Sequence, residues 1–215
     1  MNPAERGLRL RLVTAVRRLA DRGLNQGSSG NASVRFGTGF IVTPSGKAYD
    51  SMDSEDLVFV DMSGEAEGRH APSSEWRLHR DIFARHAKAG AIVHTHSPFA
   101  TTLACMHKAI PAFHYEVAFA GGDDIRCAPY ATFGTQELSD RALAALDGRR
   151  ACLLANHGAV AWSDEIERAA VLAEKVEALA QLYCQALQLG EPALLDADEM
   201  KRVLQKFESY GRSRP

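Results

Sequence analysis

The spacing of apolar residues along the chain alternates between the period of a helix and that of a strand. Between Pro3 and Gly23, apolar residues recur on a helical period with arginines on the other face, which predicts an amphipathic helix that ends at Gly23. The strongest helical pattern covers about residues 164–189, where apolar residues recur at spacings of three and four. Further helices are predicted over residues 75–86, 98–106, 135–148 and 196–211.

Short apolar and β-branched runs predict the strands. They cover residues 32–36, 40–44, 57–62, 89–96, 125–130 and 151–162, the last with a break at His157 and Gly158. The turn GTG joins the first two strands, while residues 64–72 are polar and are expected to form a loop. Hairpin neighbours mixed with helices predict a mixed or antiparallel sheet with helices on both faces. We therefore expect a single three-layer α/β/α domain over residues 1–215.

Composition and charge exclude several classes of partner. The chain has 215 residues, is 46% hydrophobic and carries a formal net charge of -2 at pH 7, so no basic excess favours nucleic acid or an anionic membrane surface. Its charged start lacks the apolar core of a signal peptide, and no segment approaches the roughly 18 apolar residues of a membrane span. The four cysteines form no CxxC pair. We expect a cytoplasmic protein with reduced cysteines and no membrane partner.

Two histidines lie at the polar end of an apolar run, in the segment VHTHSP. Residues i and i+2 of a strand point to the same face, so His94 and His96 project side by side while Thr95 faces the other way. One cation can bridge such a pair, although two hydrogen-bonded histidines at a strand end are an equally good interpretation of the pair alone.

His157 strengthens the interpretation as a metal site because it ends a second apolar run, ACLLANHG. Gly158 is expected to free the backbone for a tight bend there. Three neutral imidazoles suit Zn²⁺ and leave one position open for a substrate. Glu75, at the start of a predicted helix, is a candidate fourth ligand, or an acidic residue that complements the helix dipole. His79, in the middle of that helix, is expected to be a surface or packing residue.

Three stretches of small residues offer backbone N–H groups to an anion. They contain Ser28, Gly30 and Asn31, then Ser45 and Gly46, and finally Ser73 and Ser74, either of which can cap the helix that follows. Loops with free N–H groups and helix N-termini bind phosphate groups. A glycine–serine loop on its own is more often just a turn, so these stretches need support from elsewhere.

Seven motifs, in order and at matching separations, resemble the class II aldolase/adducin family. They are LNQGSSGNASVR, FIVTPSG, PSSEWRLH, VHTHSPFAT, FHYEVAFAGG, CAPYATFGT and ANHGAVAW, and the resemblance covers nearly the whole chain. It implies a three-layer α/β/α fold, one Zn²⁺ per subunit and a C4 homotetramer with active sites at subunit interfaces. The adducin branch has lost the metal ligands, whereas they are present here, which favours an enzyme over a non-catalytic interaction module.

The resemblance also implies roles for individual residues. The metal ligands would be His94, His96 and His157, with Glu75 as fourth ligand and general acid/base. The substrate phosphate would be held by Gly30, Asn31, Ser45, Gly46, Ser73 and Ser74, with Ser28 in the same loop. Tyr115 would reach in from the adjacent subunit to protonate the aldehyde oxygen, and Phe133 and Tyr210 would line the aldehyde pocket across the interface.

The implied reaction is reversible C3–C4 cleavage of a phosphorylated sugar, a ketose 1-phosphate. The best-matching branch of the family cleaves L-fuculose 1-phosphate to dihydroxyacetone phosphate and lactaldehyde, with zinc as the Lewis acid. Alternatives are cleavage of 5-deoxy- or 5-methylthioribulose 1-phosphate, and epimerisation, dehydration or decarboxylation of a sugar phosphate at the same site. Thr95 and Ser28 replace the Asn and Thr of the fuculose branch, which weakens the case for that substrate. A metal-dependent hydrolase barrel would take about 250 residues and needs further ligands.

Overall fold

The computed structural model of the chain describes residues 2–209, and side chains as far as residue 207. An eight-stranded sheet in the order β4-β3-β2-β1-β5-β8-β7-β6 runs through its centre. Its strands are β1 (Asn31–Phe36), β2 (Gly39–Val42), β3 (Val58–Asp61), β4 (Ala66–Glu67), β5 (Ala91–Thr95), β6 (Cys127–Ala128), β7 (Ala151–Leu154) and β8 (Gly158–Ser163). Neighbouring strands are antiparallel apart from the parallel pair β6 and β7. The predicted mixed, largely antiparallel sheet is therefore confirmed.

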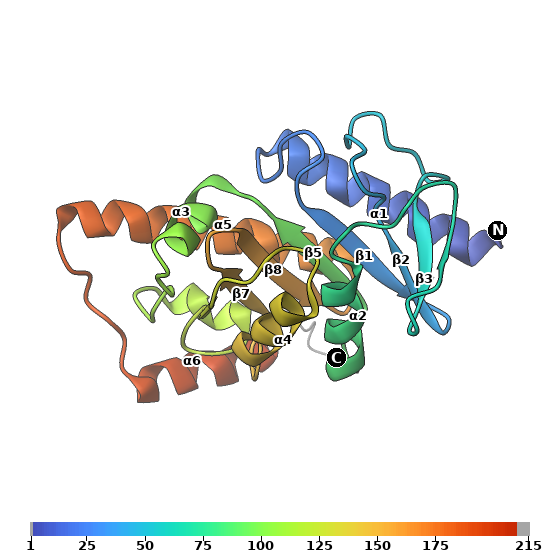
Figure 1. Cartoon of the computed structure of the whole chain (residues 1–215). Coiled ribbons are helices and arrows are strands. Elements are labelled where there is room, and N and C mark those ends of the chain that lie inside the picture. Colours follow the sequence, from blue (N-terminus) through green and yellow to red (C-terminus); the bar gives the residue numbers. More distant parts are fainter. Residues whose placement is uncertain (1, 210–215) are drawn as a thin grey trace.

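Helices cover both faces of this sheet (Figure 1). They are α1 (Pro3–Asp21), α2 (Trp76–Arg85), α3 (Pro98–Cys105), the short 3₁₀ helix η1 (Tyr115–Ala120), α4 (Gln136–Ala145), α5 (Ile166–Leu189) and α6 (Ala197–Ser209). One hydrophobic core joins α1, α3 and α5 to the sheet, and a second core joins α2 and α4 to the opposite face. These layers confirm the predicted three-layer α/β/α architecture.

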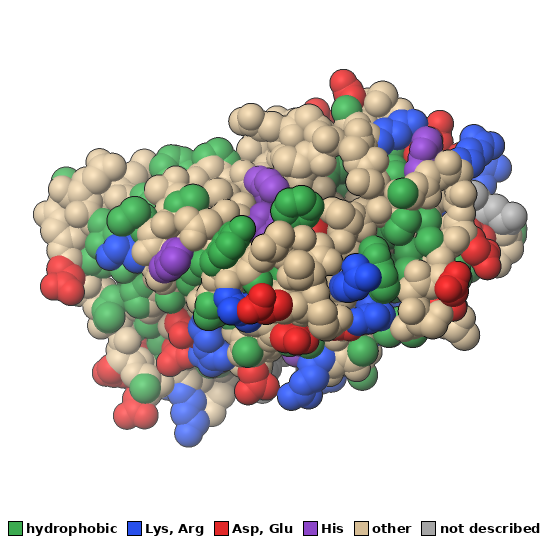
Figure 2. Space-filling model, viewed as in Figure 1, with side chains coloured by type: hydrophobic (Ala, Val, Ile, Leu, Met, Phe, Trp, Pro, Cys, Tyr) green, Lys and Arg blue, Asp and Glu red, His purple; other side chains and the backbone are tan. Residues whose placement is uncertain are grey.

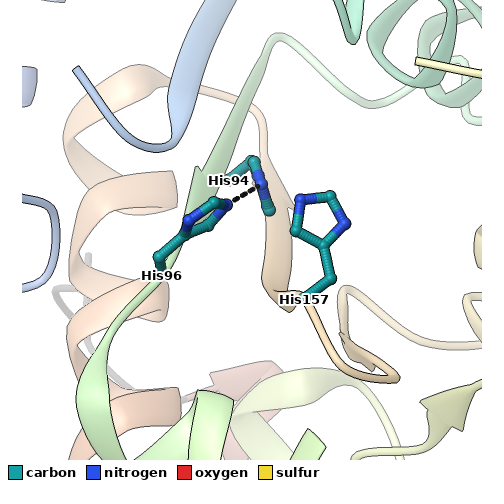
Figure 3. A group of neighbouring side chains, drawn as sticks. All are labelled: His94, His96 and His157. Atoms are coloured by element: carbon teal, nitrogen blue, oxygen red, sulfur yellow. Dashed lines mark hydrogen bonds between the residues drawn. The ribbon is translucent and has the colours of Figure 1, made fainter. Parts of the chain in front are cut away.

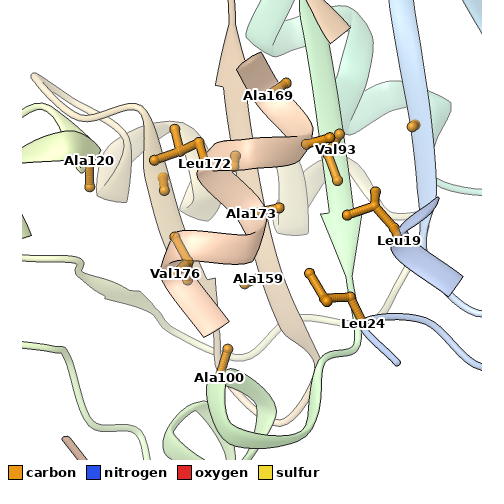
Figure 4. Packing of buried hydrophobic residues seen from close by; sticks show 14 of the residues in the cluster. Leu19, Leu24, Val93, Ala100, Ala120, Ala159, Ala169, Leu172, Ala173 and Val176 are labelled. Atoms are coloured by element: carbon orange, nitrogen blue, oxygen red, sulfur yellow. The ribbon is translucent and has the colours of Figure 1, made fainter. Parts of the chain in front are cut away.

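The alternation of side chains along β5 divides the two cores. Val93 packs in the core with α1 and α5, whereas its neighbour Ile92 packs in the core with α2 and α4. On the first face, Ala169, Ala173 and Val176 of α5 lie against the sheet (Figure 4). The face that α2 covers is the one toward which Ile92 and His94 point, because they are separated by two positions on the strand.

Three local predictions are wrong. Glu75, not Ser73 or Ser74, is the N-cap of α2, because Ser73 Oγ accepts its hydrogen bond from the Glu75 N–H (3.3 Å) two residues on, ahead of the helix. The stretch 64–72, expected to be a loop, contains the two-residue strand β4, which forms by pairing with β3. The residue with positive φ in the bend before β8 is Asn156 (φ 55), not Gly158.

All four cysteines are free thiols. Within residues 2–209, none of the helices has both the length and the apolar character that crossing a membrane requires.

Candidate active site

Three histidines lie together where the central strands β5, β7 and β8 end or begin. His94 lies on β5, His96 follows the end of that strand, and His157 lies in the turn between β7 and β8. Their rings converge (Figure 3), with centroids separated by 4.7 to 5.0 Å. One ligand nitrogen of each histidine lies within 4.8 Å of the other two. The structure therefore brings together the three histidines that the sequence singled out.

Hydrogen bonding fixes how His94 presents its ring. A carbonyl oxygen can only accept, so His94 Nδ1 donates to the Ala159 oxygen (2.9 Å). The lone pair of neutral His94 is therefore on Nε2, which lies 2.9 Å from Nε2 of His96. A buried imidazole whose Nδ1 is held by a backbone carbonyl and whose Nε2 faces other nitrogens is a common arrangement for a metal ligand.

Glu75 completes the cluster from the start of α2. Its side chain is buried, with Oε2 3.1 Å from His94 Nε2 and Oε1 3.5 Å from His157 Nε2. Oε1 accepts no hydrogen bond from residues 2–209, although it is buried. A buried carboxylate oxygen without a hydrogen bond is costly, and three imidazoles beside it form a ligand set suited to Zn²⁺. The residues present fit a divalent metal.

The electrostatics of the cluster also favour a cation. Burial opposes ionisation of Glu75, but the nearby His94 and His157 and the amide of Asn31 hold its pKa well below the usual range. Burial and the neighbouring His94 lower the pKa of His96 and of His157 to about 4, so both rings are neutral at pH 7. For His94, Glu75 outweighs burial and raises the pKa. The pocket thus favours one positive charge beside Glu75, with neutral imidazoles available as ligands.

A pocket of about 290 Å³ opens next to this cluster. It is lined by residues that the sequence predicted, namely Ser28, Gly30, Asn31, Ser45, Gly46, Ser73, Ser74, Glu75, His96, Phe133 and His157. Figure 2 shows histidine side chains reaching the surface near the middle of this face, with most of the charged side chains towards its lower edge. The pocket thus combines a possible metal position with a wall of serines and glycines.

Close backbone approaches shape both walls of the pocket. Gly30 has φ +71, and a Cβ there would lie 2.4 Å from Asn25 Oδ1 and 2.6 Å from the His94 carbonyl. Asn25 Oδ1 in turn accepts the His96 N–H (3.0 Å), so one buried amide links the serine–glycine loop to the histidine strand. At Gly158, a Cβ would lie 2.2 Å from the Thr95 carbonyl, which explains the glycine by close packing of β8 on β5.

Of the predicted site residues that the structure describes, His94 and Tyr115 do not line this pocket, although His94 belongs to the adjoining histidine cluster. Tyr115 is 49% exposed and lies in a separate groove with Phe113 and Phe207. Tyr210 lies outside the described residues. The pocket also contains residues that the prediction did not assign, namely Ser29, Pro44, Tyr130, Ala131 and Asn156. Tyr130 and Asn156 stand inside the motifs CAPYATFGT and ANHGAVAW, so their neighbours gave a signal that could have identified them.

The expectation for His79 needs correcting. Its side chain is fully buried, and both ring nitrogens are hydrogen bonded, Nδ1 with Ser33 Oγ (2.6 Å) and Nε2 with Asn31 Oδ1 (2.5 Å). It is neither a surface residue nor a simple packing residue, because it continues a polar network to Glu75. Burial lowers the pKa of His79 to about 3, so the ring is neutral.

Comparison with known proteins gives concordant results. Residues 10–184 match the family described as Class II Aldolase and Adducin N-terminal domain. A 5-methylthioribulose-1-phosphate/5-deoxyribulose-1-phosphate aldolase of Rhodospirillum rubrum is 54% identical over 95% of this chain and 92% of its own. An L-fuculose phosphate aldolase of Escherichia coli is 45% identical over 88% of each chain. A solved L-fuculose 1-phosphate aldolase has a TM-score of 0.91 and 38% identity, covering 94% of this chain and 96% of its own.

Proposed function

Because the chain belongs to the class II aldolase/adducin family, we propose that it is a metal-dependent aldolase that cleaves a ketose 1-phosphate into dihydroxyacetone phosphate and an aldehyde. The observation that carries this proposal is the buried Glu75, whose Oε1 accepts no hydrogen bond from the described residues and which lies beside three converging imidazoles and a serine–glycine pocket. His94, His96, His157 and Glu75 would hold the metal, which we propose to be one zinc ion per subunit.

The substrate phosphate fits the serine–glycine wall of the pocket. The loops that contain Ser28, Gly30, Ser45, Gly46, Ser73 and Ser74 all line it, and they offer hydroxyl and backbone N–H donors. Asn31 Nδ2 donates one hydrogen bond to Glu75 Oε2 (2.9 Å), and its second N–H can donate a hydrogen bond to a ligand. Phosphate held here would place the sugar carbons next to the histidines.

When bound, the metal supplies Lewis acidity to the carbonyl oxygen of the substrate. The chain itself would move the protons. Tyr115 of a neighbouring subunit, as its phenolate, would take the proton from the C4 hydroxyl as the C3–C4 bond breaks and its electron pair passes to C3. Glu75, displaced by the substrate and protonated from water, would then deliver this proton to C3, which completes dihydroxyacetone phosphate. Tyr115 returns its proton to water after the aldehyde leaves, so one proton is taken from solvent and one is given back in each cycle.

The use of Tyr115 in this scheme requires a homotetramer with active sites between subunits. Its exposure and its position in a groove separate from the pocket support a role outside its own subunit. Phe133, which is 63% exposed at the pocket, and Tyr210 would line the aldehyde end across the same interface. Gel filtration with light scattering tests the assembly, since a monomeric active enzyme would contradict this part of the proposal.

Two kinds of ketose 1-phosphate are the main substrate candidates. The 54% identity to an aldolase named for 5-methylthioribulose 1-phosphate and 5-deoxyribulose 1-phosphate supports a ketose with a methyl or methylthio end. The exposed rings of Tyr130 and Phe133 at the pocket suit such an apolar end. L-fuculose 1-phosphate is the second candidate, supported by 45% identity and by the solved structure with a TM-score of 0.91.

The test is a panel assay on zinc-loaded protein. Fuculose, rhamnulose, 5-deoxyribulose and 5-methylthioribulose 1-phosphates are supplied separately, and dihydroxyacetone phosphate is measured with a coupled reductase. We expect zinc-dependent release that EDTA abolishes, fastest with the 5-methylthio or 5-deoxy substrate. No release from any substrate by protein that contains zinc would refute the aldolase and favour an epimerase, dehydratase or decarboxylase.

A further inference from the structure

A buried polar network extends from the candidate active site into the space between α2 and the sheet, beginning at Asn31 and Glu75 of the pocket lining. It runs from Ser33 through His79 and Asn31 to Glu75, with successive distances of 2.6, 2.5 and 2.9 Å. The side chains of all four residues are buried, and His79 is fully so. Two members, Ser33 and His79, touch neither the pocket nor the histidine cluster, so the mechanism described above leaves them without a role.

The spacing of the two elements that carry this network explains why it forms. Asn31 and Ser33 are two positions apart on β1, which separates them by about 6.7 Å on one face of the strand. Glu75 and His79 are four positions apart, one on the cap and one inside α2, which separates them by about 6 Å along one helix face. The spacing of Asn31 and Ser33 therefore matches that of Glu75 and His79 when α2 packs on this face of the sheet. The antiparallel pairing of β1 with β5 also places Asn31 opposite His94.

Hydrogen-bond chemistry fixes every orientation in the chain. Ionised Glu75 can only accept, so the amide group of Asn31 that faces it must be the NH₂. Asn31 Oδ1 then faces His79 Nε2, which must carry a proton in order to donate. In the neutral ring Nδ1 is then the acceptor, and the Ser33 hydroxyl donates to it. The low pKa of His79, caused by burial, agrees with a neutral ring.

We propose that His79, locked by Ser33 into its Nε2–H tautomer, is a positioning residue that holds Asn31 in one amide orientation and thereby anchors Oε2 of Glu75. The anchored oxygen leaves Oε1 as the one that exchanges between the metal and a substrate proton. This inference rests on the proposed function for its catalytic consequence, whereas its structural consequence concerns the metal site and can be measured without turnover.

The test compares two substitutions of His79. In His79→Gln the amide NH₂ still donates to Asn31, whereas His79→Leu keeps an apolar volume without a donor. We expect His79→Leu to lower zinc affinity, measured by competition with a chelator, and kcat, each by about 10- to 100-fold, with KM changed less than about 3-fold. His79→Gln should recover both to within about 3-fold of wild type. The control is His86→Gln, at the other end of α2 and outside the network, which should match wild type.

Several results would overturn the proposal. Wild-type zinc affinity and kcat in His79→Leu would show that the network does not position Glu75. Equal losses in His79→Gln and His79→Leu would show that the imidazole acts by packing alone. If His79→Leu does not fold, Ser33→Ala takes its place, with a smaller loss of affinity expected in the same direction and an unchanged affinity counting against the proposal. Failure of the wild type to cleave any ketose 1-phosphate would refute the proposed function but leave the affinity comparison valid.

Discussion

Replacing Gly158 with alanine tests how strictly the fold controls the distances between the proposed metal ligands. A Cβ at this position would lie 2.2 Å from the Thr95 carbonyl and 3.1 Å from Cδ2 of His96. Since real Cβ atoms essentially never approach within 3.0 Å, β8 must move away from β5 by at least 3.0 minus 2.2, or 0.8 Å. Metal–ligand distances tolerate about 0.2 Å. A displacement of this size between His157 and the pair His94 and His96 should therefore disrupt the proposed metal site.

The expected results are a large loss of zinc affinity and a decrease of about 1–3 kcal/mol in the free energy of unfolding. Zinc affinity is measured by chelator competition, and stability by urea unfolding of metal-free protein, so that the two effects are separated. The matched control is Gly7→Ala in α1, where an added Cβ meets no atom within 4 Å. That variant should be more stable by about 0.5–1 kcal/mol and bind zinc normally. Wild-type affinity and stability in Gly158→Ala would refute the reasoning.

Three further predictions follow from the same structure. Glu75→Gln should reduce kcat by about 10²- to 10⁴-fold because it removes the acid/base, while zinc analysis finds the metal retained by three histidines; normal turnover would contradict the role. Removing the metal with EDTA should lower the free energy of unfolding by about 2.7 kcal/mol relative to free zinc at 100 times its Kd, and an unchanged melting temperature would argue against a metal site. Burial opposes ionisation of Asp56, but the Asp53 N–H, Lys47 and His70 lower its pKa to about 2. The ionised carboxylate therefore stabilises the folded protein above about pH 4, and this contribution is lost as the pH falls towards 2. Urea unfolding between pH 5 and pH 2.5 should show a weaker pH dependence in Asp56→Asn than in wild type.

Local patterns were sufficient to predict the cluster of three histidines and the layers of the fold. The two-residue period of a strand places His94 and His96 on one face. A second apolar run that ends in His157 predicts a third histidine near this pair. The helical periods of α1 and α5 gave their positions within a few residues. These features could be predicted because each depends on residues close together in the sequence.

The features that were missed depend on partners far away in the sequence. His79 looks like any polar residue in an amphipathic helix, and its hydrogen-bond partner Ser33 is 46 positions away on β1. Strand β4 has two residues and exists because β3 pairs with it. Likewise, Gly158 is required by the carbonyl of Thr95 on a neighbouring strand, not by its own backbone angle. Periodicity carries no information about such contacts.

The proposed metal ligands also come from distant parts of the chain, which has a consequence for the order in which the protein would fold and bind metal. Glu75 and His157 are separated by 82 positions, and His157 is brought to His94 by the pairing of β8, which begins at Gly158, with β5. An unfolded chain therefore offers zinc little more than the adjacent pair His94 and His96, and closing the loops between the other ligands has an entropic cost. Unlike a zinc finger, whose folding requires metal, this sheet is expected to form before the proposed site binds its ion. Zinc should accordingly slow unfolding while leaving the rate of refolding nearly unchanged.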